Sequence, residues 1–121
     1  WPGEYDAEKT RAALARTINI TAWDGGRLAG CLRILTDGCY FGTITELLVL
    51  PACRRQGVGR AFFAFAEELA RQRGLSALRI DTYRLNLRMQ ALILSRGFTK
   101  VGEIRLHGRP LPYPCFEKAL N

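Results

Sequence analysis

The sequence is poor in the residues that metal centres and disulfide scaffolds need. Its 121 residues include one histidine and four cysteines, and the cysteines have neither zinc-site spacing nor paired spacing. We therefore expect no metal, and we interpret the cysteines as free thiols of a cytoplasmic protein, because reducing compartments keep thiols unpaired. They are Cys31, Cys39, Cys53 and Cys115. A catalytic cysteine is the alternative, although no motif connects the single histidine, His107, with any of them.

Membrane-length apolar runs and a secretory start are also absent. No apolar stretch approaches the length of a transmembrane helix, so we expect no membrane partner. The first residues include Glu4, Asp6 and Glu8 in place of the basic and then apolar start of a signal peptide. The length, and a hydrophobic content of 48%, are those of one compact domain over residues 1–121.

Acidic residues are too few to balance the basic ones, and the formal net charge is +7. Such a surplus suits a basic nucleic-acid-binding module, whose usual signs are a basic stripe with interleaved aromatics or a known motif. The arginines instead gather in two places, at residues 54–60 and 79–96. We therefore expect a smaller phosphate-bearing ligand and no nucleic acid, and we keep the nucleic-acid module as the alternative from another class.

The most informative segment covers residues 51–61. It follows an apolar run at 44–50 and opens an amphipathic helix, so a buried strand leads through a turn into a helix start. Gly57 and Gly59 let the backbone bend and expose its amides. A helix start has N–H groups without internal partners and a partial positive charge. This segment therefore predicts a cradle for a phosphate or pyrophosphate, with added positive charge from Arg54, Arg55 and Arg60.

The pattern of the cradle excludes two common phosphate loops. No Lys or Ser/Thr follows Gly59 directly, as a P-loop requires. Phe62 stands where the dinucleotide fingerprint needs its third glycine. What remains is Arg-x-x-Gly-x-Gly after a strand, which resembles the acetyl-CoA pyrophosphate loop of the GNAT N-acetyltransferase superfamily.

A second motif supports this resemblance. A strand at 78–82, Asn86 at the start of a short helix, and Gly97-Phe98 after it resemble the family's strand, Asn, helix and Gly-Phe block. The chain from residue 27 to its C-terminus is thus identified as a member of this superfamily. The resemblance implies an α/β (α+β) fold with a mixed, mostly antiparallel, V-split sheet flanked by helices. It also implies an N-acetyltransferase that transfers the acetyl group of acetyl-CoA to a primary amine by direct attack.

The periodicity of the sequence gives a layout that agrees with this fold. We expect helices at 6–17, at 57–73 and from residue 86, and strands at 18–23, 28–35, 44–50 and 78–82. A closing antiparallel pair follows, with one strand ending at 104 and the other at 112–120. Helical spacing predicts Phe62 and Phe65 as core residues, together with Phe98, and Trp23 is expected to pack.

One departure from the family concerns the start of the chain. Relatives begin with a strand and a helix before the element at 6–17, so the first strand is apparently missing here. Either the sequence is an N-terminally truncated fragment, or a partner or an atypical N-terminus completes the sheet edge. Because dimers are common among proteins that resemble this one, a homodimer is a candidate oligomeric state.

The resemblance assigns cofactor roles by position. Backbone amides on the third strand would hold the pantetheine arm and polarise the acetyl carbonyl, and these belong to Leu47, Leu48 and Val49. The pyrophosphate would lie on the loop formed by Arg54, Arg55, Gln56, Gly57, Val58, Gly59, Arg60 and Ala61. Asn86 would bond the pantetheine amides, cap its helix, or do both.

Candidates for the general base are two carboxylates. Asp81 stands five residues before Asn86, where some relatives that acetylate protein N-termini place a carboxylate, and its alternative role is to cap the following turn. Glu46 is the second candidate, either beside the substrate on the open sheet face or on a solvated edge. A base is needed because a lysine-like amine, with a pKa of about 10.4, is mostly protonated at neutral pH.

The general acid of the family does not carry over. Its tyrosine, seven residues after the Asn, is replaced here by Ile93. Tyr83 could substitute as acid or serve only in packing, or the thiolate could leave without an acid. The acceptor, a small-molecule amine or a peptide, is not encoded in a readable motif. His107 and Tyr113 lie in a loop that often borders the acceptor site in this fold, and an exposed loop histidine without a role is the alternative. A catalytically weak CoA-binding domain is the rival function.

Overall fold

The computed structural model describes residues 6–120. Within these residues the chain forms three α-helices, a short 3₁₀ turn and six strands. In chain order they are α1 (Ala7–Ala15), β1 (Ile18–Asp24), β2 (Arg27–Thr36), β3 (Phe41–Val49), η1 (Pro51–Cys53), α2 (Val58–Gln72), β4 (Ala77–Asp81), α3 (Leu87–Ser95), β5 (Thr99–Ile104) and β6 (Tyr113–Ala119). The expected order of helices and strands is confirmed.

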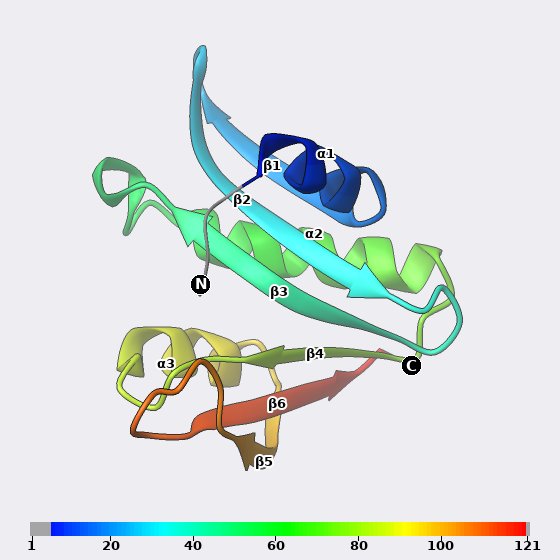
Figure 1. Cartoon of the computed structure of the whole chain (residues 1–121), viewed down its shortest axis with the longest axis vertical. Helices are drawn as coiled ribbons and strands as arrows, with labels where there is room; N and C mark the ends of the chain where they lie inside the picture. The colour runs from blue at the N-terminus through cyan, green and yellow to red at the C-terminus, as the bar shows by residue number, and fades with distance from the viewer. Residues whose placement is uncertain (1–5, 121) are drawn as a thin grey trace.

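The six strands form one sheet in the order β1-β2-β3-β4-β6-β5. Only β3 and β4 run parallel, and every other neighbouring pair is antiparallel. Antiparallel neighbours need only a short turn, whereas the parallel pair needs a crossover, which α2 supplies. In Figure 1, α2 lies behind the sheet of β1, β2 and β3, and α1 lies on the opposite face, in front of β1. The mixed, mostly antiparallel sheet flanked by helices is therefore confirmed.

The sheet splits between its two parallel strands. β4 pairs with β3 only from Phe41–Ala77 to Ile44–Ile80, and β3 then continues to Val49 beside β2 alone. A bulge marks this point, because Arg33 pairs with Glu46 while its neighbour Ile34 pairs with Ile44. Such a bulge bends its strand. Figure 1 shows β3 and β4 diverging from this point toward α3, as the V-split sheet requires.

The core lies between α2 and the sheet, and one predicted core residue is wrong. The buried residues of α2 are Phe62, Phe63, Ala66, Glu67 and Ala70. Phe65 is 66% exposed, whereas Phe62 and Phe98 are buried as expected. The buried face of α2 is rotated by about one residue from the predicted one, because both Phe62 and Phe63 face the sheet and Phe65 points away.

Trp23 also differs from the expectation that it packs. It is 61% exposed, and its indole N–H donates to Thr21 Oγ1 at 3.0 Å. The physical reason is an irregularity in the ladder between Ala22 and Trp23, after which Trp23 pairs with the half-exposed Leu28. The regular alternation of side chains ends at such a shift, so the sequence pattern of the strand does not place its last residues.

The expected loss of a first strand concerns the chain before α1, where residues 1–5 lie outside the described residues. In the described sheet, β1 is an edge strand. Among residues 6–120 no helix is both long and apolar enough to cross a membrane.

Candidate active site

The turn that we predict to cradle a phosphate lies at the start of α2. Gly57 is the N-cap residue, with a positive φ of 81° that glycine adopts without strain. The first intrahelical bond runs from Ala61 N to Gly57 O at 3.0 Å, and no side chain caps the helix. The amides of Val58, Gly59 and Arg60 therefore precede the helical ladder and are available to an anionic ligand.

A cleft of about 570 Å³ opens from this cradle toward β3 and α3. Ten of the twelve residues predicted to bind the cofactor line it, namely Leu47, Leu48, Val49, Arg54, Arg55, Gly57, Val58, Gly59, Arg60 and Asn86. The other two, Gln56 and Ala61, line a smaller neighbouring cleft beside β1. The structure thus brings residues from three separate segments to one concave site, as ligand sites usually require.

Four further residues line the same cleft and were not predicted, namely Cys53, Arg88, Met89 and Leu92. Three of them belong to α3, whose N-terminal half faces the cleft. The spacing of Met89 and Leu92 could have signalled this, because Met89 lies three residues after Asn86 and Leu92 three after Met89, and residues three positions apart on a helix are neighbours. Arg88 adds a further positive charge to a cleft that already holds Arg54, Arg55 and Arg60.

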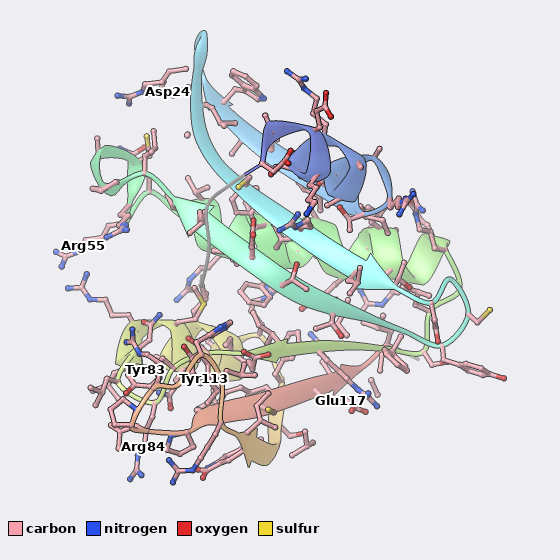
Figure 2. All side chains as sticks on the ribbon, in the orientation of Figure 1. Asp24, Arg55, Tyr83, Arg84, Tyr113 and Glu117 are labelled. Atoms are coloured by element: carbon pink, nitrogen blue, oxygen red, sulfur yellow. The ribbon has the colours of Figure 1, made fainter. Side chains whose placement is uncertain are left out.

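The arginines of the cradle occupy different positions. Arg54 donates from Nε to the carbonyl oxygen of Val49 at 3.1 Å and so ties the loop to the end of β3. Arg55 has a positive φ of 65°, and Figure 2 shows its side chain projecting outward from the turn between β3 and α2. Arg27 donates to Cys53 Sγ at 3.4 Å on the other side of the turn. The loop is therefore held to β3 while Arg55 extends from it.

The free part of β3 directs backbone groups into the split. Leu50 N donates to Ala29 O at 2.8 Å, so at this position β3 bonds to β2. Because backbone groups alternate along a strand, the N–H of Leu48 also faces β2, whereas those of Leu47 and Val49 face away from it. No β4 residue pairs with β3 beyond Ile80. The alternation therefore offers Leu47 and Val49, rather than Leu48, as amide donors to a ligand in the cleft.

Asn86 caps α3 and lies in the cleft. Its side-chain oxygen accepts from Met89 N at 3.2 Å and caps α3. Asn86 also lines the cleft. Because the side-chain amide nitrogen remains a donor while the oxygen caps the helix, capping and ligand binding are compatible.

Glu46 forms an ion pair with Arg33, its neighbour across the β2–β3 ladder. The Glu46 side chain is 36% exposed and the Arg33 side chain 21%. Leu47, the next residue, packs against the core, so Glu46 lies on the sheet face opposite α2. The ion pair occupies the Glu46 carboxylate with Arg33, and this weakens Glu46 as the base.

Asp81 lies at the point where the V opens, one residue after the last β3–β4 pair. It is half-buried, and burial raises the pKa of its carboxyl above the usual range, while His107 acts in the opposite direction. Asp81 faces Cys115 across the β4–β6 ladder, and burial raises the pKa of that thiol as well. A raised carboxyl pKa is typical of general bases and brings Asp81 closer to working pH.

The two positions considered for the acid have different surroundings. Tyr83 is half-buried, and its hydroxyl oxygen accepts from Leu111 N at 3.3 Å, which leaves the hydroxyl proton available as a donor. Ile93, at the family's tyrosine position, is fully buried in the core. Its replacement of a tyrosine therefore fills the core and adds no polar group to the cleft. Among residues 6–120, no group of three or more His, Cys, Asp or Glu residues could hold a metal ion.

Comparison with known proteins identifies the family. Residues 1–98 match the Acetyltransferase (GNAT) family, which is most of the chain. The chain belongs to this family, as its two motifs predicted. It is 37% identical over 83 residues to an aminoglycoside N(6')-acetyltransferase type 1 of Klebsiella aerogenes, covering 66% of this chain and 55% of that protein. It is 34% identical over 104 residues to an IAA acetyltransferase of Azospirillum brasilense, covering 84% and 67%.

Solved structures confirm the fold. The ribosomal-protein-S18-alanine N-acetyltransferase of Escherichia coli superposes with a TM-score of 0.81 at 21% identity, over 98% of this chain and 80% of that one. A GNAT acetyltransferase of Elizabethkingia anophelis with acetyl-CoA bound gives 0.83 at 15% identity, over 95% and 84%. The chain spans only about half of the length of the aminoglycoside relative.

Proposed function

We propose that this chain binds acetyl-CoA in the 570 Å³ cleft and transfers the acetyl group to the primary amine of an acceptor. The observation that carries this proposal is the convergence on one cleft of the α2 amides, four arginines and the end of β3 that β4 no longer pairs. The residues fit the ligand, because the amides and arginines suit a pyrophosphate and the apolar lining suits a pantetheine arm. Relatives with this fold have been solved with CoA or acetyl-CoA bound.

In the proposed reaction, the amine lone pair attacks the thioester carbonyl carbon and the carbon–sulfur bond breaks. The Leu47 and Val49 amides polarise the carbonyl, since donors aimed at the developing oxyanion lower the barrier. Asp81 takes the proton that the amine nitrogen loses, directly or through water. The departing thiolate takes a proton from Tyr83 or from solvent. The reaction needs no redox step and no covalent intermediate on the enzyme.

The rival is a CoA-binding domain with little catalysis. It is favoured by Ile93, because the position of the family's acid holds a buried core residue. Binding without turnover would distinguish it from a transferase. For the whole protein, we propose a cytoplasmic location, in keeping with four free cysteines among residues 6–120, and we retain a homodimer as its candidate assembly.

The test is isothermal titration of acetyl-CoA into the wild-type chain and the Arg60→Glu variant. This substitution reverses one charge in the cleft but places an acidic residue in the first turn of α2, where it favours the helix. We expect micromolar binding that the variant weakens at least tenfold. Arg11→Glu in α1 is the matched control, with the same change in net charge outside the cleft. A folded wild-type chain without affinity for acetyl-CoA would overturn the proposal.

A further inference from the structure

A second patch of side chains lies beside the split, on the sheet face away from α2. Backbone bonds from Thr82 N to Pro114 O (3.3 Å) and from Arg84 N to Pro112 O (3.2 Å) continue the β4–β6 ladder beyond the end of β4. Asp81 and Tyr83 therefore point to one face of this ladder, with Cys115 and Tyr113 opposite them. These are the positions where the two backbones approach most closely and cross-strand side chains touch.

The aromatic members of this patch form a connected cluster. The rings of Tyr83 and Tyr113 have centroids 5.1 Å apart, and the His107 ring meets Tyr113 edge-on at 5.9 Å. The Arg109 guanidinium lies 4.3 Å from the centre of the Tyr83 ring. The same loop contacts Tyr83 a second time, because Leu111 N donates to the Tyr83 hydroxyl. Figure 2 shows Tyr83 and Tyr113 together at the end of β6 near α3. We call Tyr83, His107 and Tyr113 the aromatic shelf.

The charges on this side of the sheet would repel a polycation. Glu46 pairs with Arg33, and Glu117 pairs with Arg79 at 3.0 Å. Asp81 forms no ion pair with any of the described residues. The loop beside the aromatic shelf adds the cations Arg105 and Arg109. One free carboxylate can attract one ammonium, but among residues 6–120 this surface has no further unpaired acid for a second or third amine.

We propose that the acceptor is an arylalkyl monoamine, whose ring packs on the aromatic shelf and whose amine lies at Asp81. This inference rests on the proposed acetyl transfer and adds the chemical class of the acceptor. Stacking on Tyr113 and His107 supplies affinity for a planar ring. Asp81, two residues before Tyr83 on the same face, then meets the amine next to the open end of β3.

The test measures acetyl transfer as release of the CoA thiol with four acceptors. These are tyramine, n-butylamine as a monoamine without a ring, and the polycations spermidine and kanamycin. We expect kcat/KM for tyramine to exceed that for n-butylamine by roughly 3- to 10-fold, the range that a ring–ring contact supplies. Both polycations should react more slowly still.

Variants connect this preference with the aromatic shelf. Tyr113→Ala should lower the tyramine to n-butylamine ratio toward one, and Tyr113→Phe should retain it. Tyr40→Ala is the matched control, since Tyr40 is 70% exposed in the turn between β2 and β3. Acetyl-CoA affinity, measured by titration, verifies that each variant is folded.

Two kinds of failure are distinguishable. If acetyl-CoA binds and kanamycin or spermidine is preferred, or tyramine is not acetylated, the acceptor class is wrong and the cofactor site stands. If acetyl-CoA does not bind, both proposals fall. A tyramine preference that Tyr113→Ala leaves intact would also overturn the role of the aromatic shelf.

Discussion

At the scale of single residues, the site depends on a few positions whose chemistry is set by close neighbours. Asp81 is the clearest case, because its carboxyl is half-buried beside Cys115 and only His107 compensates the burial. Gly30 is another, because the backbone of β3 passes so close to it that no side chain fits.

Asp81→Asn should lower activity and raise stability at neutral pH. Removal of a general base lowers kcat/KM by about 100-fold or more. Because the pKa of Asp81 is higher in the folded than in the unfolded state, the folded state binds more protons between these two pKa values. Stability therefore falls as pH rises through that range. The variant should therefore unfold at a higher urea midpoint at pH 7, and this difference should shrink below about pH 4, where unfolded aspartate is protonated.

The pH–rate profile of His107→Gln tests the same role of Asp81. His107 opposes the rise in the pKa of Asp81, so its loss should move the ascending limb of the pH–rate profile to higher pH. An unchanged profile, or a profile that Asp81→Asn also leaves intact, would remove Asp81 from the role of base.

Gly30→Ala should weaken the fold and the cofactor site together. A Cβ at this position would lie 2.6 Å from the backbone oxygen of Leu48 and 3.1 Å from the Phe62 ring, so β3 must shift. We expect a loss of about 1–3 kcal/mol in urea unfolding, with weaker acetyl-CoA binding by titration. Gly102→Ala is the control, since nothing lies within 4 Å of its Cβ position. Equal effects of the two variants would contradict this account.

At the scale of elements, α2 performs two tasks with different parts of its length. Its first turn offers unpaired amides to the cleft, and its later turns pack Phe63, Ala66 and Ala70 on the sheet. Gly59 lets α3 approach closely, because a Cβ there would lie 3.0 Å from Leu92. The core contacts of α2 therefore determine how accurately its N-terminus and α3 frame the cleft.

Two phenylalanines of α2 that lie two residues apart should differ sharply on truncation. Phe63 is fully buried and meets Phe98 edge-on at 5.6 Å, so Phe63→Ala should cost about 3–5 kcal/mol in thermal or urea unfolding. Phe65→Ala should change stability by only about 0.5 kcal/mol, because Phe65 is exposed. A large loss at Phe65 would mean that another surface covers it in the folded protein.

At the scale of the whole molecule, one buried charge cluster joins distant segments. Glu67 of α2 accepts from Arg96 Nη2 at 2.8 Å and from Lys118 Nζ at 3.0 Å. Lys118 also donates to the Arg96 carbonyl at 2.5 Å. The Glu67 side chain is 4% exposed, whereas both cations reach solvent in part. The cluster thereby connects α2, the end of α3 and β6 behind the sheet.

Glu67→Ala should destabilise the protein by about 3 kcal/mol, because two half-buried cations lose their carboxylate. The value lies at the low end for a buried pair, since both cations can regain water. Glu103→Ala removes the exposed pair with Lys100 and should leave stability almost unchanged, because exposed pairs contribute little. Urea denaturation of both variants tests this difference, and similar losses would mean that Glu67 contributes no more than a surface carboxylate.

Much of this architecture could be predicted from the sequence. The order of elements follows local signals, namely the 3.6-residue spacing of α2, the turns at Gly25 and Gly38, and Asn86 at a helix start. The cradle was readable because glycines and arginines next to a strand and helix form a local motif. Ten predicted residues accordingly line one cleft, and their part in binding stays a prediction.

What failed or was missed depends on contacts between distant segments. Phe63 and Phe65 are chemically alike and only two residues apart in α2, so only the docking angle of α2 on the sheet decides which one is buried. Likewise, no local pattern places Arg33 beside Glu46 or Arg88 in the cleft.

The sequence by itself determined the elements, their order and the anion cradle, because backbone propensity and helix-start chemistry act over a few residues. Only the tertiary structure decided which arm of the V offers free amides and which carboxylates are already paired. It also decided that Tyr83, His107 and Tyr113 share a surface. These features depend on the register between strands far apart in sequence, where the end of β3–β4 pairing at Ile80 opens the sheet.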